Sequence, residues 1–296
     1  MLYGVEVWGP YCLNKFCCND RYSLYDLFCN TSSLYEKLHS KFCKLTLSVH
    51  KKSSNIGVRT ELGRYPICIN IISQVTQYFV NICNRDSGSI VKQMLFFQNR
   101  LYEITPRRSW FSLLYFINKH TQWKAIQNIN NIFTSYVDMK LLLCSKYEQC
   151  FSNIVKDNNK LNVLFDIKKV FGISKYLTYV SNHKYRKAFT MFRISAHSFP
   201  VEVGRYRSVD RNNRICAICN CNEIGDEFHY FMKCTDINIQ QLRKDFLSSV
   251  LSVNIQLEKL PEKCLFNYLL CGSDVNLLPR TAEYIYNIIS YYRSKQ

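Results

Sequence analysis

Hydrophobic positions recur along this chain at the spacing of α-helices. After Ser33, apolar residues step by four, four, three and four positions, which places them on one face of a helix from about Leu34 to His50. This face consists of Leu34, Leu38, Phe42, Leu45 and Val49. Ser33 and Glu36 have the spacing of a capping box, which begins a helix. The pattern predicts a helix whose apolar face packs inward, with Lys37, Lys41 and Lys44 as a neighbouring cationic stripe.

The same periodicity predicts two amphipathic helices near the C-terminus. Their apolar faces are Ile239, Leu242, Phe246, Val250 and Val253 in one helix, and Ala282, Ile285, Ile288, Ile289 and Tyr292 in the other. In the middle of the chain, apolar runs such as CINIISQVTQYFVNIC and YVDMKLLLCSKYEQCF favour buried helices of a bundle. Loops are expected at SVHKKSSNIG and IVKDNNKLN, and a helix break at ITPRRSW, because a residue before proline disfavours the helical conformation.

Composition supports this helical interpretation. The 296 residues include only 9 Gly and 6 Pro, which favours long elements with few turns, and 47% hydrophobic residues suffice for a folded core. No apolar run approaches the roughly 18 residues of a spanning helix, so we do not expect an integral membrane protein. We expect a mainly α-helical fold, long enough for two modest domains.

The charge of the chain favours a polyanionic partner. Lys and Arg number 39 against 22 Asp and Glu, for a formal net charge of +17, which makes nucleic acid the first candidate and an anionic membrane surface the second. Seven basic residues and a single acid lie between positions 37 and 64, and eight basic residues and two acids between 184 and 214. Aromatic residues, among them Phe199 and Tyr206, alternate with the second group, a combination that suits phosphate contact and base stacking. A solvated helix edge and ordinary core packing are the alternatives.

Fifteen cysteines raise the question of disulfides. The count is odd, the spacing is irregular, and the N-terminus lacks the basic and apolar regions of a secretory signal. We therefore expect an intracellular protein, cytoplasmic or nuclear and not secreted, whose cysteines are buried small hydrophobes or metal ligands.

Four residues have the spacing of a structural zinc site. Cys216, Cys219, His229 and Cys234 form the pattern C-x2-C-x9-H-x4-C, and a Cys-x2-Cys turn places two thiolates on one side of a loop. Three thiolates and an imidazole leave no position for an activated water, so one structural Zn²⁺ is expected, with Cys221 left over. Chance clustering of cysteines that pack as apolar residues is the alternative. Asp226 is expected to cap a short helix that carries His229 and ends before Cys234.

Three blocks of this sequence resemble the C-terminal part of reverse transcriptases from LINE-type, non-LTR retrotransposons. They are LYGVEVWG (residues 2–9), YEKLHSKFCKLTLSVHKKSSNIGVRTELGRYP (35–66) and FRISAHSFPVEVGRYRSVDRNNRICAICNCNEIGDEFHYFMKC (192–234). The resemblance implies that the first two blocks lie in and just after a helical thumb that grips the template and product duplex. It implies that the third block is a terminal cysteine-histidine domain that binds nucleic acid.

The chain lacks the catalytic part of that family. Nucleotidyl transfer needs a palm domain with an aromatic-x-Asp-Asp turn whose carboxylates hold two Mg²⁺ ions, and no adjacent Asp-Asp pair occurs in this sequence. The tetrapeptide YVDM at 136–139 has one carboxylate and is interpreted as core helix. We expect no catalytic residues and no enzymatic activity, and we expect the chain to be a truncated remnant without fingers, palm or endonuclease.

These observations combine into one prediction: a helical bundle with a small C-terminal zinc-binding domain. The expected divisions are a thumb-like segment (1–66), a helical connector (67–175) and a basic, zinc-knuckle-like domain (176–296). RNA or DNA is the expected partner, with no membrane, bound by Lys37, Lys41, Lys44, Lys51, Lys52, Arg193, Arg205, Arg207, Arg211 and Arg214. The alternative is a structural or protein-interaction module, or a decayed fragment without selected activity.

Overall fold

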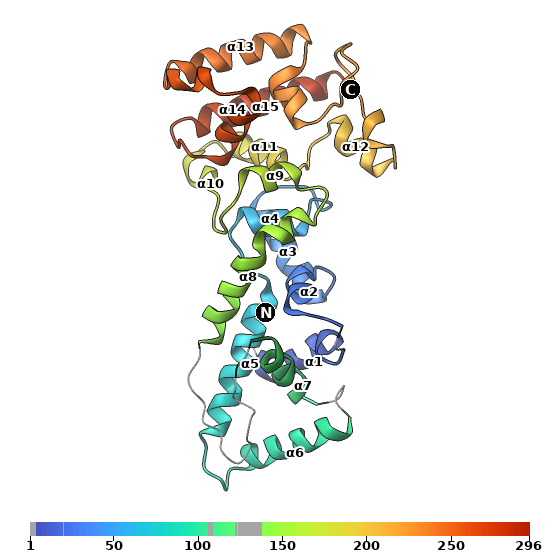
Figure 1. Ribbon diagram of the computed structural model, residues 1–296, viewed down its shortest axis with the longest axis vertical. Helices are drawn as coiled ribbons and strands as arrows, with labels where there is room; N and C mark the ends of the chain where they lie inside the picture. Colours follow the sequence, from blue (N-terminus) through green and yellow to red (C-terminus); the bar gives the residue numbers. More distant parts are fainter. Residues whose placement is uncertain (1–3, 20, 106–108, 122, 124–137) are drawn as a thin grey trace. The chain divides into compact units, whose positions relative to one another are not determined.

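The computed structural model describes residues 4–19, 21–105, 109–121, 123 and 138–296, and these residues are mainly helical (Figure 1). The described residues contain no β-strand, and their only bridges are Leu62 with Ile173 and Ile215 with Ile224. The mainly α fold class is thereby confirmed. The helices are α1 (Val5–Cys17), α2 (Leu24–Cys29), α3 (Leu34–Thr46), α4 (Asn55–Glu61), α5 (Ile67–Cys83), α6 (Ile90–Ile104), α7 (Phe111–Thr121), α8 (Met139–Lys156), α9 (Asn162–Ile167), α10 (Tyr176–Tyr179), α11 (His183–Arg193), α12 (Pro200–Tyr206), η2 (Arg211–Asn213), the π-helical η3 (His229–Lys233), α13 (Ile237–Leu251), η4 (Ile255–Lys259), α14 (Glu262–Cys271) and α15 (Leu278–Ser294).

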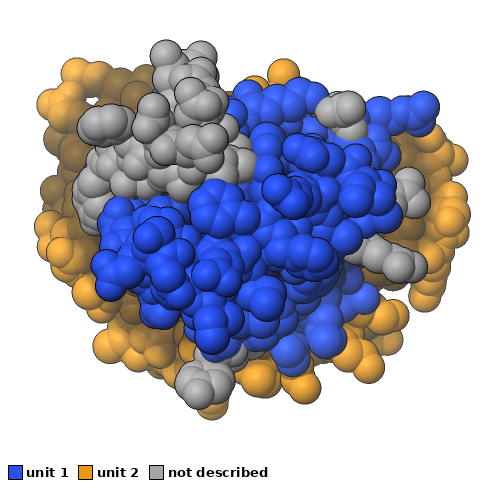
Figure 2. All heavy atoms as spheres, turned by 90° about the horizontal axis from the view of Figure 1, so that it is seen from below, with its two compact units in different colours: residues 1–39, 65–151 blue, residues 40–64, 152–296 orange. Residues whose placement is uncertain are grey.

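The chain forms two compact units, coloured separately in Figure 2. Unit 1 combines residues 1–39 and 65–151, and unit 2 combines residues 40–64 and 152–296. Each unit is therefore assembled from two separate stretches of chain; two of the three boundaries fall inside α3 and α8, and the third lies between α4 and α5. The division of the chain into domains at 1–66, 67–175 and 176–296 remains a prediction.

Unit 1 is built around α5. Helix α1 packs on α5 and α7, and α6 packs on the same two helices. Gly9 permits the close approach of α1 to α5, because a Cβ atom there would lie 2.7 Å from Cγ2 of Ile71. The predicted burial of the apolar run in α5 is confirmed, since Ile71, Ile72 and Phe79 are buried. In α8 burial is one-sided: Leu143 and Tyr147 are buried while Leu141 is exposed.

Unit 2 contains an aromatic core on which the candidate metal ligands lie. Helix α15 packs against α11, α13 and α14, and the ring of Phe231 lies 5.3 Å from that of Phe266 and 5.0 Å from that of Tyr284. The apolar face predicted for α15 is buried throughout, and that of α13 is buried at Ile239, Phe246 and Val250 but not at Val253. Cys216 and Cys234 belong to this core.

The predicted helix break and one predicted loop agree with the described helices: α6 ends at Ile104 before the proline-containing stretch, and α8 and α9 are separated within IVKDNNKLN. The other predicted loop, SVHKKSSNIG (48–57), is shorter than expected, because α4 begins at Asn55 within it. Positions 106–108, and positions 136 and 137 of the tetrapeptide YVDM, lie outside the described residues; Met139 of this tetrapeptide is the buried first residue of α8. No helix in the described part of the chain is long and apolar enough to cross a membrane.

The prediction for the buried face of α3 is wrong. The helix begins at Leu34 as expected, but Leu34, Phe42 and Leu45 are 74%, 56% and 69% exposed. The inward side is instead the neighbouring stripe of Tyr35, Glu36, Ser40 and Cys43, continued by Leu47. The Glu36 carboxylate accepts a hydrogen bond from the backbone N–H of Ile67 at 2.6 Å, which fixes this polar stripe against α5.

Helix α3 is also shorter than predicted. It ends at Thr46 and not at His50, because Ser48 has a left-handed backbone (φ 54°) that no helix can continue. The N–H groups of Ser48 and Val49 bond back to the carbonyls of Leu45 and Lys44 and close the last turn.

Candidate metal centre and cationic surface

A short hairpin-like segment presents Cys216 and Cys219. Ile215 pairs with Ile224, the N–H of Cys216 donates to the carbonyl of Glu223 at 2.8 Å, and the N–H of Gly225 donates to the carbonyl of Arg214 at 2.9 Å. Gly225 is required for this arrangement, because a Cβ atom there would lie 2.9 Å from Pro200 and 3.1 Å from the Cα atom of Cys216. The Cys-x2-Cys loop is therefore held at its base by backbone hydrogen bonds.

The π-helix η3 presents the other two candidate ligands. Asp226 accepts a hydrogen bond from the N–H of His229 at 3.0 Å, which confirms its predicted capping role. On an α-helix, residues five apart point in different directions, but here the N–H of Cys234 donates to the carbonyl of His229 at 2.7 Å. This i to i+5 bond of the π-turn brings positions 229 and 234 to the same side, and the helix ends before Cys234 as predicted.

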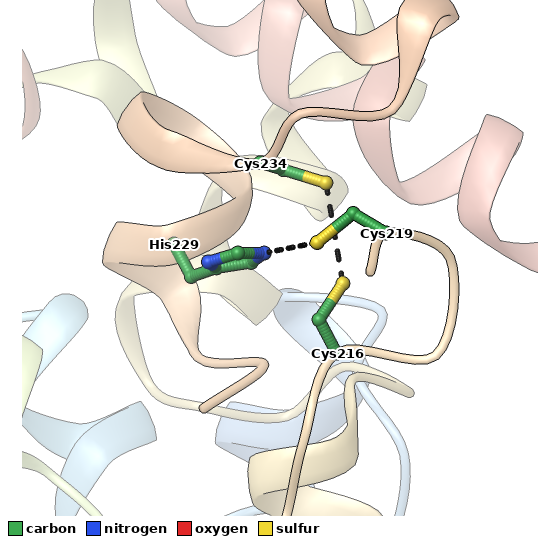
Figure 3. Close-up of side chains that lie close together, drawn as sticks. All are labelled: Cys216, Cys219, His229 and Cys234. Carbon is green, nitrogen blue, oxygen red and sulfur yellow. Dashed lines mark hydrogen bonds between the residues drawn. The ribbon is translucent and has the colours of Figure 1, made fainter. Parts of the chain in front are cut away.

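The four predicted ligands lie around one point (Figure 3). Sγ of Cys216 lies 4.0 Å from Sγ of Cys234, Sγ of Cys219 lies 3.3 Å from Nε2 of His229, and the four ligand atoms are all within 4.8 Å of one another. A tetrahedral zinc with Zn–S bonds of about 2.3 Å needs ligand atoms separated by about 3.8 Å. The four residues can therefore hold a metal ion with little movement.

Two further residues support this cluster, and the spacing pattern does not single them out. The carboxylate of Glu223 lies 2.9 Å from Nδ1 of His229, which leaves Nε2 of the same ring directed at Cys219. Carboxylates in this position orient metal-bound histidines and increase their basicity. The hydroxyl of Tyr230 is hydrogen-bonded to Sγ of Cys216 at a distance of 3.3 Å. A sequence signal exists only for Glu223, as an acid within the ligand loop.

The electrostatics of the cluster favour a thiolate. Hydrogen bonding from Cys234 is the main cause that lowers the pKa of Cys216, and burial opposes it. For His229 the largest single effect is burial, which lowers the pKa of the ring. Hydrogen bonds to Cys216 and Glu223 together outweigh burial and raise the pKa of His229 to about 9. In the metal-free chain the ring thus carries a proton that a metal must displace, so binding releases protons and depends on pH.

All fifteen cysteines are free thiols in the structure. Cys221, which the spacing leaves over, is exposed, and its sulfur lies 2.8 Å from the hydroxyl of Thr235. It is therefore a natural control for the four clustered residues.

One of the predicted nucleic-acid contacts is a residue of the core. The side chain of Arg193 is 3% exposed, its Nε donates to the Glu61 carboxylate at 2.8 Å, and its NH1 group donates to the carbonyl of Leu270. The prediction that Arg193 contacts phosphate is therefore corrected. The charge pattern could not reveal this, because the pairing joins positions 132 apart.

Two other predicted contacts are occupied inside the fold. Arg214 lies along Gly204 and donates to the carbonyls of Val209 and Val201, so it braces the loop in front of the metal cluster. Arg211 lies 3.3 Å from Asp226, although its side chain remains half exposed.

Basic residues from separate stretches of the chain meet in unit 2 at Tyr206, whose side chain is 57% exposed. The ammonium groups of Lys52 and Lys160 lie 5.6 and 5.3 Å from the centre of its ring. Lys44 donates to the carbonyl of Lys51 at 2.7 Å, and its pKa is lowered by burial and by the nearby Lys160. We call this patch the Tyr206 surface; it comprises Lys44, Lys51, Lys52, Lys160, Arg205, Tyr206 and Arg207.

The Tyr206 surface joins two basic stretches that lie about 150 positions apart in the sequence. Glu202 offsets part of its charge by pairing with Lys160 and, at 3.5 Å, with Arg205. Among the described residues, no carboxylate pairs with the side chains of Lys51, Lys52 or Arg207, which are exposed. Lys37 and Lys41 are exposed on α3. Lys160 was absent from the predicted contacts, since only its place in space reveals it.

No protein-family model, curated protein or solved structure matches this chain.

Proposed function

We propose that this chain binds RNA or DNA through the Tyr206 surface, and that a structural Zn²⁺ on the four clustered residues holds the neighbouring basic loop in shape. The observation that carries the proposal is the approach of the Lys52 and Lys160 ammonium groups to the exposed ring of Tyr206, with the exposed Lys51 and Arg207 next to these residues in the chain. Cations around an exposed aromatic ring are suited to phosphate contacts and base stacking. Little base preference is expected, because this surface has no helix of the kind that reads a groove.

The resemblance to LINE-type reverse transcriptases supports the same proposal. Residues 40–64 of the second block and all of the third block (192–234) belong to unit 2, and they contribute the two sides of the Tyr206 surface. We propose that the chain corresponds to the thumb and cysteine-histidine region of such a protein and is inactive as a polymerase by itself. Purified protein with Mg²⁺, template, primer and nucleotides should give no primer extension, and extension by clean protein would refute this part.

Salt dependence tests the binding proposal. Each phosphate neutralised by a lysine or arginine releases counterions, so the logarithm of affinity falls with the logarithm of salt by about 0.7 to 0.9 per contact. The triple substitution Lys51→Gln, Lys52→Gln and Arg207→Gln should weaken binding to all sequences and reduce the slope by about 2 to 3.

The matched control changes the same charge elsewhere in unit 2. Lys244, Lys259 and Arg293 are exposed, and their replacement by glutamine should leave the slope unchanged. If both triple variants bind alike, general charge and not the Tyr206 surface is responsible, and the proposal fails.

Elemental analysis tests the zinc. Protein purified without chelators should contain one zinc per chain, which Cys216→Ser should abolish and Cys221→Ser should not. Equal zinc in both variants, or none in the parent protein, would contradict the assignment.

A specific observation favours protein interaction as the second candidate. On α6 the residues Ile90, Met94, Phe97 and Ile104 are all exposed, and Leu101 completes a spacing of four, three, four and three positions. Such a stripe is typical of a helix that packs against another helix. A chain that shows no salt-dependent nucleic-acid binding but self-associates through this stripe would support the second candidate.

A further inference from the structure

A cavity of about 370 Å³ lies in unit 2, and its lining shares no residue with the metal cluster or the Tyr206 surface. It is lined by the end of α9 and the segment that connects α9 to α10 (residues 167–175), together with Arg193 and Cys271. The volume is within the range of pockets that bind small molecules. Since one loop supplies most of the wall, the conformation of that loop decides whether the cavity is a formed site.

The loop is held in place by the end of α4. Ile173 forms an antiparallel bridge with Leu62, and the N–H of Ser174 donates to the carbonyl of Glu61 at 2.9 Å. Gly63 has a left-handed backbone (φ 59°), and a Cβ atom there would lie 2.5 Å from the backbone nitrogen of Ile173. Only glycine permits this close approach of the two segments, so the cavity wall is fixed by the fold.

The cavity wall has an excess of positive charge. Lys168, Lys169, Lys175 and Arg193 contribute to its lining, and no acidic side chain does. Glu61, buried behind the wall, pairs with Arg193. Three ammonium groups are therefore left without a carboxylate of the lining to neutralise them.

The three lysines differ in their freedom. Lys168 is partly buried, and its ammonium donates to the carbonyl of Gly172 at 2.6 Å and to the hydroxyl of Ser174 at 2.7 Å. Burial is the main cause that lowers its pKa to about 8; Glu61 opposes this shift and Arg193 adds to it. Lys169 donates to the carbonyl of Phe165, and Lys175 is exposed. An anion in the cavity would thus stabilise the protonated form of the partly buried Lys168. It could also contact the ammonium groups of Lys169 and Lys175, which are exposed residues of the lining.

The rest of the lining is apolar. Ile167 is buried, Phe171 is half-buried, and Val170 and Ile173 are exposed. A small inorganic anion would leave this apolar surface unused. A ligand with a compact, doubly charged group and a flat or apolar body would use both parts of the wall.

We propose that this cavity binds a phosphomonoester with an aromatic body, the chemistry of a nucleoside 5′-monophosphate or of the 5′-phosphorylated end of a strand. A phosphomonoester carries up to two negative charges at neutral pH, whereas each phosphodiester of a nucleic-acid backbone carries one. Three lysines in a lining that contains no carboxylate favour the doubly charged group. The site is distinct from the Tyr206 surface, and neither needs the other.

Equilibrium dialysis of the full chain against a labelled nucleoside 5′-monophosphate tests the site. Saturable binding is expected, with the unphosphorylated nucleoside a poor competitor and inorganic phosphate a weaker competitor than the nucleotide. The double variant Lys169→Gln and Lys175→Gln should weaken binding by about tenfold or more, because two charge-assisted contacts are lost. Both lysines are outside the Glu61–Arg193 pair, so the fold is expected to persist, as circular dichroism would show.

The matched control is Lys244→Gln with Lys259→Gln, which removes the same charge from exposed positions outside the cavity lining and should leave affinity unchanged. Absence of saturable binding, or equal loss in both double variants, overturns the proposal.

Competition with oligonucleotides separates the two sources of the ligand and tests the specificity. An oligonucleotide with a 5′-phosphate should displace the nucleotide better than the same strand with a 5′-hydroxyl if strand ends enter, and neither should displace it if only free nucleotides do. Equal displacement by both strands would show recognition of phosphodiesters and overturn the proposal. The variant Lys51→Gln, Lys52→Gln and Arg207→Gln should retain nucleotide binding even where nucleic-acid binding is lost, and loss of both would also overturn it.

Discussion

At the scale of residues, a substitution of Glu223 tests whether the cysteine and histidine cluster binds a metal. Its hydrogen bond to Nδ1 of His229 fixes the ring so that Nε2 faces Cys219. Replacement of such a carboxylate typically costs about 10- to 100-fold in metal affinity. We expect Glu223→Gln to weaken zinc binding by about that factor in chelator competition, with Glu258→Gln, on η4, as control. Equal affinity in the two variants would mean that the Glu223 contact has no role in metal binding.

Arg193 provides a second prediction at this scale. Removing one partner of a buried ion pair leaves the other charge uncompensated and typically costs about 3 to 5 kcal/mol. Arg193→Ala should therefore destabilise unit 2 by about that amount in urea unfolding, and the paired change Glu61→Leu with Arg193→Met should restore part of the loss. If Arg193→Ala is as stable as the parent protein and its nucleic-acid binding depends less steeply on salt, Arg193 contacts phosphate as the charge pattern predicted.

The contrast between Cys216 and Arg193 explains what residue patterns predict. The four cysteine and histidine positions lie within 19 residues, so local spacing constrains where their side chains meet, and the predicted set converges. The partner of Arg193 is 132 positions away, and charge density gives no information on such a contact. The contact of Tyr230 with Cys216 could not be predicted for a related reason. A tyrosine next to a metal ligand in the sequence has the same pattern as a tyrosine of the hydrophobic core.

At the scale of elements, helix positions followed from periodicity more reliably than helix orientation did. All five residues predicted for the apolar face of α15 are buried, and the buried face also includes Leu278, Thr281 and Tyr284. On α3 either of two neighbouring stripes could face the core. The stripe that is buried contains Glu36, which is hydrogen-bonded to Ile67, a residue 31 positions further along the chain. The hydrophobic pattern predicts that the more apolar stripe is buried, but that stripe is the exposed one.

A matched pair of leucines tests the orientation of this segment. Leu45 is 69% exposed, whereas Leu47, directly after α3, is 5% exposed. Leu47→Ala should destabilise unit 2 by about 2 to 5 kcal/mol, and Leu45→Ala by about 0.5 kcal/mol or less. Urea unfolding followed by circular dichroism measures both changes. The reverse order would restore the orientation predicted from the hydrophobic pattern.

At the scale of the whole molecule, each compact unit combines chain segments that are far apart, which local patterns do not predict. Residues 40–64 belong with the C-terminal part of the chain because Glu61 pairs with Arg193 and Leu62 pairs with Ile173. The same segment carries Lys52 to the ring of Tyr206, and its contacts hold the loop that lines the cavity. The sequence indicated two basic stretches, and only the fold makes one surface of them.

Removal of the metal should affect the two units differently. Cys216 and Cys234 lie in the aromatic core of unit 2, and in structural zinc sites the binding free energy is largely folding free energy. A strong zinc chelator should therefore increase hydrogen exchange across residues 192–296, including α13 and α15, while peptides from α5 in unit 1 keep their protection. The Cys221→Ser protein should respond like the parent protein, whereas Cys216→Ser should show the increased exchange before any chelator is added.

Nucleic-acid affinity should fall together with the protection of α12, because Arg205 and Arg207 depend on that segment for their positions. Uniform loss of protection in both units, or none in either, would contradict a structural metal confined to unit 2.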